Sequence, residues 1–201
     1  MSLSPWVTCL LAFLFGAIPF GLVIGKLKGV DLRTKGSGNI GASNAMRELG
    51  KPLGALVFML DTLKGWLPVF AAHQLGFSPE WLVGVGLAAV FGHIYSPFVR
   101  FKGGKGVATA LGVLLGLDWR VALIAFGVFI VVVAVTDYIS VGSISAAVAQ
   151  AALFWVFADP LPLKLFGAVV GLFVIVRHHS NIQRLLKGEE NRLRKKATQP
   201  V

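Results

Sequence analysis

Long apolar stretches separated by short polar segments dominate this chain. Seven of them can be followed along the sequence, at residues 4–24, 53–73, 81–99, 106–117, 121–135, 143–158 and 163–176. A helix that crosses a bilayer needs about 20 residues, with a working range of about 17 to 25, and the first three stretches meet that length. The pattern therefore predicts an all-α, polytopic integral membrane bundle.

The fourth and fifth stretches are short, and only residues 118–120 separate them. They form either two short tilted helices or a re-entrant pair. Two spans are favoured, because Asp118 and Arg120 suit a membrane interface better than a buried position. This choice gives about seven transmembrane helices.

Composition agrees with a membrane protein. Of the 201 residues, 56% are hydrophobic and 14% charged, and the mean hydropathy is +0.77, more apolar and less charged than a soluble domain. The length fits a single domain over residues 1–201, with a basic tail from about residue 188 that we expect to lie near anionic lipid headgroups. The first stretch has no preceding basic residue and no small-residue cleavage site, which predicts an uncleaved anchor.

The distribution of basic residues predicts the orientation. With seven spans and the N-terminus outside, sixteen of the nineteen Lys and Arg residues fall in cytoplasmic segments and two outside, while Lys64 lies within the second span. Cytoplasmic loops of membrane proteins are enriched in Lys and Arg. The N-terminus is therefore expected outside, and the C-terminus in the cytoplasm.

The formal net charge of +10 suggests an anionic partner. Nucleic acid is disfavoured, because a membrane-embedded chain has little free surface for a duplex, so anionic lipid or an anionic substrate remains. A single cysteine, Cys9, allows no internal disulfide.

Three polar segments fall on the predicted cytoplasmic side. The first, residues 36–47, reads GSGNIGASNAMR and combines glycines, small hydroxyl and amide side chains, and an Arg able to grip phosphate. The alternative is a flexible loop whose Gly and Asn residues form turns. The segment alone does not choose between the two.

The second segment, residues 101–109, reads FKGGKGVAT. It fails the P-loop pattern because Gly106, rather than Ser or Thr, follows Lys105, which argues against an NTPase. A glycine-rich turn that opens a helix is nevertheless an anion site. The alternative is a basic interfacial turn with snorkelling lysines.

The third segment, residues 177–184, reads RHHSNIQR and continues to Glu190. Its Arg residues are also expected simply as charges that end a last span. His178 and Asn181 share a helix face if the helix persists. No third metal ligand accompanies the paired histidines, so no metal site is predicted.

Charged and hydroxyl residues also interrupt the spans. Asp61 and Lys64, three apart, are expected to pair within the second span, either for function or to lock the bundle. The short turn after the fifth span carries Asp137, Tyr138 and a run of serines. Together these features predict a phosphate site at the membrane surface, with lipid beside it.

The three segments resemble the signature segments of the PlsY family, the bacterial acyl-phosphate-dependent glycerol-3-phosphate acyltransferases. The likeness extends from the first span to Glu190, with Ser43 where the family more often has Thr. It implies transfer of a fatty acyl group from acyl phosphate to sn-glycerol 3-phosphate, giving 1-acylglycerol 3-phosphate (lysophosphatidic acid) and phosphate, the first step of bacterial phospholipid synthesis. The implied location is the bacterial inner membrane, with the active site on the cytoplasmic side.

The resemblance also implies which residues form the site. The expected catalytic residues are Ser37, Arg47, Lys105, Ser143, His178 and Asn181. The expected substrate-binding residues are Asn39, Asn44, Gly103, Gly104, Gly106 and Glu190, with no role assigned to Glu190. The implied partners are glycerol 3-phosphate, acyl phosphate, membrane lipid and the enzyme that makes acyl phosphate, with no cofactor and no nucleic acid.

The residues themselves suggest a mechanism without a protein general base. No His is followed five residues later by Asp, the spacing that related acyltransferases use as a base, and no nucleophile–base pair is evident. We therefore expect catalysis by charge stabilisation and positioning, with a substrate phosphate accepting the hydroxyl proton. The alternative from another class is a membrane transporter of an anionic phosphorylated solute, although such sites lie near the midplane rather than on one face.

Overall fold

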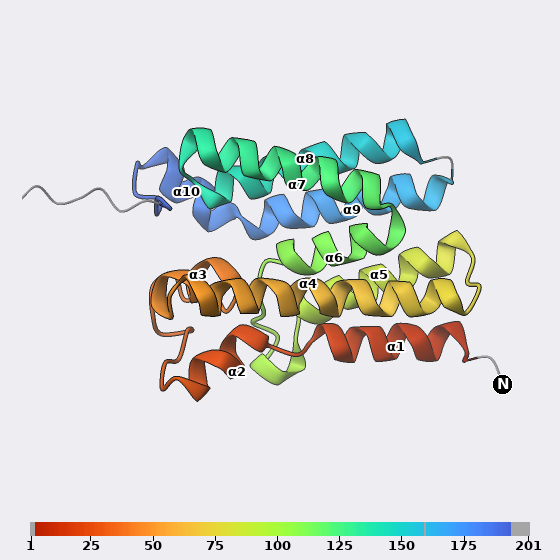
Figure 1. The fold of residues 1–201 in the computed structure, drawn as a ribbon, viewed down its shortest axis with the longest axis horizontal. Helices are drawn as coiled ribbons and strands as arrows, with labels where there is room; N and C mark the ends of the chain where they lie inside the picture. The colour runs from red at the N-terminus through yellow and green to blue at the C-terminus, as the bar shows by residue number, and fades with distance from the viewer. Residues whose placement is uncertain (1–2, 159, 194–201) are drawn as a thin grey trace, which may run out of the picture.

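The computed structural model describes residues 3–158 and 160–193, which form helices and connecting turns without a β-strand (Figure 1). The first half contains α1 (Pro5–Gly16), α2 (Phe20–Leu27), α3 (Ala42–Glu48), α4 (Lys51–Gln74), α5 (Pro79–Ile94) and the 3₁₀ turn η1 (Pro97–Val99). The second half contains α6 (Val107–Leu117), α7 (Trp119–Thr136), α8 (Ile139–Phe157), α9 (Leu161–Arg177) and α10 (His179–Leu186). The end of the basic tail lies outside the described residues.

All seven apolar stretches are helical, which confirms an all-α membrane bundle. Within the described residues, five segments are long and apolar enough to cross a bilayer: Pro5–Leu27, Lys51–Gln74, Pro79–Val99, Trp119–Thr136 and Ile139–Phe157. A sixth is counted if α9 and α10, which meet at a bend of 53°, are taken together. The total of seven spans and the outside N-terminus stay predictions.

The short helix α6 has 11 residues. At 1.5 Å per residue its length is about 16 Å, roughly half of a hydrocarbon core of about 30 Å. Figure 1 shows that α6 begins inside the bundle and ends at the turn into α7. Its neighbour α7 is longer than its apolar stretch, because the Asp118 side chain accepts from the Arg120 N–H and starts the helix at Trp119.

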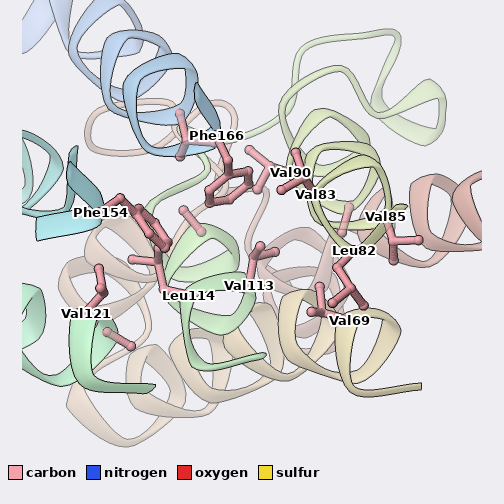
Figure 2. Packing of buried hydrophobic residues seen from close by; sticks show 14 of the residues in the cluster. Val69, Leu82, Val83, Val85, Val90, Val113, Leu114, Val121, Phe154 and Phe166 are labelled. Carbon is pink, nitrogen blue, oxygen red and sulfur yellow. The ribbon is translucent and has the colours of Figure 1, made fainter. Parts of the chain in front are cut away.

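The helices pack in two groups with α6 between them. One group is built from α1, α4 and α5, and the other from α7, α8 and α9. Where α4 meets α6, Gly65 and Gly112 let the two backbones touch, because a Cβ on either would overlap the partner helix. Figure 2 shows the apolar core, in which the Phe154 and Phe166 rings meet edge to face with centroids 5.9 Å apart.

The predicted Asp61–Lys64 pair is present, and its lysine binds the chain at the break between α1 and α2. The two charges are 2.7 Å apart and almost fully buried. Lys64 Nζ also donates to the Ile18 carbonyl at 2.7 Å, and Ser96 Oγ donates to the Ala17 carbonyl at 2.6 Å. Because the break between α1 and α2 frees backbone carbonyls inside the membrane, these two donors satisfy groups that lipid cannot.

Candidate active site

A cavity of about 310 Å³ opens among the helices that the three polar segments bring together. All the predicted site residues except Gly103 and Gly104 line it: Ser37, Asn39, Asn44, Arg47, Lys105, Gly106, Ser143, His178, Asn181 and Glu190. Figure 1 shows α2, α3 and α10 at one end of the bundle and the start of α1 at the other. Segments that are far apart in the sequence therefore meet at one end of the molecule.

The loop before α3 is held by its asparagines. The buried Asn44 donates to the carbonyls of Leu32 and Lys35 at 3.1 Å each and accepts from the Ser37 N–H at 3.0 Å. Asn39 accepts from the Gly41 N–H at 2.8 Å, just before α3 begins. The polar pattern of this segment thus serves to fix the loop, which presents the Ser37 hydroxyl 3.4 Å from an Arg47 nitrogen.

The glycine-rich turn before α6 is bonded on both sides. The N–H groups of Gly103 and Gly104 donate to the carbonyls of Ile94 and His93 at 3.1 and 3.2 Å. Their own carbonyls accept from Arg177 Nη2 at 3.3 and 3.2 Å. The peptide groups of Gly103 and Gly104 are therefore bonded to the protein, and the residues that line the cavity here belong to the start of α6.

Gly106 occupies the position before α6 with a φ of 84°, a conformation that glycine adopts without strain. The next residues, Val107 and Ala108, line the cavity. N–H groups in the first turn of a helix have no partner within that helix, and the helix dipole is positive there. The anion-binding feature predicted from FKGGKGVAT thus falls at Gly106 and the first turn.

Glu190, which lines the cavity, is the centre of a polar network. Its Oε1 accepts from Asn181 Nδ2 at 2.6 Å and from Ser140 Oγ at 2.8 Å, and its Oε2 accepts from Arg184 Nε at 2.7 Å. Burial alone would raise the pKa of Glu190, but these hydrogen bonds outweigh it and lower the pKa. Glu190 therefore ties α8 to α10 as a carboxylate, a role that the sequence did not indicate.

Lys105 is joined to this network through Asn181, whose Oδ1 accepts a hydrogen bond from Nζ. Burial lowers the pKa of Lys105 to about 8; Glu190 opposes the shift, while Arg184, Arg47 and Arg177 add to it. A second, smaller polar cavity of about 110 Å³ adjoins the first and is lined by Ser37, Gly38, Asn39, Lys105, Ser180 and Arg184. Lys105 thus borders both cavities.

His178 lies beyond the end of α9, where the chain bends into α10. Its Nδ1 is 2.7 Å from the Val174 carbonyl, which assigns the proton to Nδ1, because a carbonyl oxygen can only accept. Burial and the nearby Lys105 lower the pKa of His178 to about 4, so the ring is neutral near pH 7. On α8, Ser143 Oγ donates to the Ile139 carbonyl at 2.9 Å and keeps its lone pairs as acceptors.

Much of the cavity surface is apolar. Side chains of α4, α6, α7, α8 and α9 line it, including Phe58, Leu111, Leu114, Phe126, Phe129, Ala146, Val170 and Val174. The Phe58 and Phe126 rings stack across α4 and α7 with centroids 6.1 Å apart. Sequence reasoning missed these residues, because an apolar side chain facing a cavity has the same composition as one facing lipid.

Within the described part of the chain, no group of three His, Cys, Asp or Glu side chains is arranged to hold a metal ion. The charged side chains instead suit an anion. The cations Arg47, Lys105 and Arg184 line the two cavities. Each carboxylate that lines the main cavity already has a cationic partner, since Glu190 pairs with Arg184 and Asp61 with Lys64. The arrangement can bind phosphate groups next to a slot for an alkyl chain.

Fold and site together define a multi-pass membrane protein with an amphipathic cavity, lined by both cationic and apolar side chains. Residues 6–188 match the model of the family described as glycerol-3-phosphate acyltransferase. The glycerol-3-phosphate acyltransferase of Geobacter sulfurreducens is 47% identical over 193 residues, covering 96% of this chain and 99% of that protein. That of Aquifex aeolicus is 47% identical over 182 residues, covering 90% and 95%.

Two solved structures are also similar. They are described as PlsY, an integral membrane glycerol 3-phosphate acyltransferase, in a glycerol 3-phosphate form and a lysophosphatidic acid form. The first has a TM-score of 0.91 at 45% identity, the second 0.88 at 44%, and each comparison covers 94% of both chains. This chain belongs to the glycerol-3-phosphate acyltransferase family of integral membrane proteins.

Proposed function

We propose that this protein transfers a fatty acyl group from acyl phosphate to sn-glycerol 3-phosphate, at the cytoplasmic side of the bacterial inner membrane. The products are 1-acylglycerol 3-phosphate and inorganic phosphate. The observation that carries the proposal is the cavity of about 310 Å³, whose lining combines cationic and polar side chains with many apolar ones. Both substrates carry a phosphate, and the donor also carries an alkyl chain.

Phosphate recognition is assigned to the cations and the start of α6. Arg47 and Lys105 each provide a positive charge, Ser37 a hydroxyl, and Gly106 with the first turn of α6 a set of N–H donors. The adjoining polar cavity beside Lys105 offers room for a second phosphate. The solved relatives described as glycerol 3-phosphate and lysophosphatidic acid forms support an acceptor and a product of this kind.

In the reaction, the acceptor hydroxyl oxygen attacks the acyl carbonyl carbon, and the bond from that carbon to the phosphate oxygen breaks. The leaving phosphate carries away the electron pair of that bond and accepts the hydroxyl proton. Since a general base works best with a pKa near the working pH, the lowered pKa of His178, about 4, makes it a poor base. His178 and Ser143 are instead assigned to orienting the hydroxyl, and Arg47 and Lys105 to stabilising the charge on phosphate.

Turnover by purified protein in detergent tests this function. Radiolabelled glycerol 3-phosphate and a long-chain acyl phosphate should give labelled 1-acylglycerol 3-phosphate without any membrane gradient. A transporter of phosphorylated solutes would form no acylated product, and that result would overturn the proposal.

A matched pair of variants locates the chemistry in the cavity. Ala146 lines the apolar part, whereas Val148, on the same helix, is 55% exposed and lies outside the cavity lining. Ala146→Trp should fill the slot and abolish activity with long acyl chains, whereas Val148→Trp should be silent. Equal activity in the two variants would place the acyl chain elsewhere.

A further inference from the structure

Arg177 stands out because it binds the protein backbone rather than facing a cavity. It is a cation at the end of α9, next to the site residue His178, yet it lines neither the main nor the smaller cavity. Its Nη2 donates to the carbonyls of both Gly103 and Gly104. Its Nε is buried and has no hydrogen-bond partner among the described residues.

The turn that Arg177 holds is also fixed by other contacts. The two N–H groups of this turn are bonded to the end of α5, as described above, and Gly104 lies against the His93 ring. A Cβ on Gly103 would overlap the His93 carbonyl, and one on Gly104 would overlap that ring. The turn is therefore fixed between the end of α5 on one side and the guanidinium of α9 on the other.

Lys105 directly follows this turn in the chain. Its side chain reaches Asn181 on α10, whereas its backbone follows the two carbonyls that Arg177 holds. Two contacts thus join the Gly103–Lys105 segment to the α9–α10 junction. Arg177 binds the turn before Lys105, and Asn181 binds the Lys105 ammonium. Because α9 and α10 meet at a 53° bend beside these contacts, both anchors come from one junction.

We propose that Arg177 is a positioning residue, which sets the place of Lys105 by holding the Gly103–Gly104 turn. It does not bind substrate itself. The inference rests on the proposed function, since the role of Lys105 is to bind a substrate phosphate. It assigns to Arg177 a purpose beyond the general rule that basic residues follow a last span.

A double-mutant cycle tests the inference with Arg177→Gln, Lys105→Met and the pair, all in purified protein. Loss of a charge-assisted hydrogen bond predicts that Arg177→Gln lowers kcat/KM by about ten- to a hundredfold. If Arg177 acts through Lys105, the same change in the Lys105→Met background should cost less than about threefold. Labelled glycerol 3-phosphate and long incubations allow the residual rates to be measured.

Controls separate this role from folding. Arg192→Gln removes an exposed guanidinium that lies over the Tyr138 ring, outside both cavities, and should leave kcat/KM unchanged. If Arg177→Gln inserts poorly, the cycle is run with Arg177→Lys, whose charge is retained but whose shorter side chain reaches the carbonyls less well. Thermal unfolding in detergent should show each variant to be folded.

The outcomes are distinct. A loss of equal size in both backgrounds, or no loss in the wild-type background, overturns the positioning role. A wild-type protein without turnover overturns the proposed function, and this inference with it. If the wild-type protein is active and the losses from Arg177→Gln and Lys105→Met multiply in the double variant, only this inference is overturned.

Discussion

Basic residues near the site include two kinds that composition does not distinguish. Lys64 and Arg177 satisfy backbone carbonyls, whereas Arg47 and Lys105 point into a cavity. The sequence placed Arg47 and Lys105 at a phosphate site through motif resemblance, and left Lys64 and Arg177 open to more than one interpretation. Only the fold shows which carbonyls lack partners.

The geometry of Arg47 and Lys105 yields a direct prediction. Arg presents a planar fork and Lys a compact point charge, so exchanging them keeps the charge but alters the contact. Arg47→Lys and Lys105→Arg should each lower kcat/KM by roughly ten- to a hundredfold while membrane insertion stays normal. Lys187→Arg, at an exposed position beyond α10, is the control and should be silent in the same assay. Near-normal activity in both site variants would place the phosphate ligands elsewhere.

The pH dependence follows from two shifted groups. The role proposed for Lys105 requires its protonated ammonium, and its lowered pKa of about 8 predicts that kcat/KM falls as pH rises through that value. His178, with a pKa of about 4, is neutral throughout pH 5–8 and should add no step there. An acid limb near pH 6 is expected from glycerol 3-phosphate, a phosphate monoester whose second pKa is about 6.

The pH–rate profile of kcat/KM, corrected for spontaneous hydrolysis of acyl phosphate, checks this. A flat profile from pH 7 to beyond pH 9 would show that the Lys105 ammonium is not required. Lys105→Arg gives a second readout, since its residual activity should lack the alkaline limb.

At the scale of elements, the broken first span depends on a charge pair in the second. Removing one partner of a buried pair leaves an uncompensated charge, which costs about 3–5 kcal/mol. Lys64→Met should therefore destabilise the protein strongly, and adding Asp61→Asn should restore part of the loss. The midpoint of thermal unfolding in detergent measures both effects. A double variant less stable than Lys64→Met would contradict the pairing.

The elements show how far sequence reasoning reaches. Apolar length predicted every long helix, because a lipid-facing helix must be apolar over its whole length. The sequence shows that the fourth stretch is short but leaves open a tilted helix or one arm of a re-entrant pair; in the fold, α6 begins inside the bundle, at the site. Sequence reasoning did not identify the carbonyls that hold the Gly103–Gly104 turn or the apolar cavity wall around Phe126, since tertiary contacts define both.

At the scale of the whole molecule, the site and the basic loops gather at one end of the bundle. Charge distribution predicts that this end faces the cytoplasm. In a Cys9→Ser background, an impermeant thiol reagent added to intact spheroplasts should label Ser78→Cys, in the exposed α4–α5 turn, and not Lys187→Cys. Lysis should make both reactive. Labelling of Lys187→Cys in intact spheroplasts would reverse the orientation.

We propose that one cavity brings an acyl phosphate and glycerol 3-phosphate together without a protein base or a thioester donor. To test this, purified protein is given labelled glycerol 3-phosphate with one of three sole donors in parallel: an acyl phosphate, the matching acyl-CoA or the matching acyl carrier protein. We predict labelled 1-acylglycerol 3-phosphate from the acyl phosphate alone, with one inorganic phosphate released for each ester formed. Efficient turnover with either thioester as the sole donor would show that the protein does not depend on acyl phosphate.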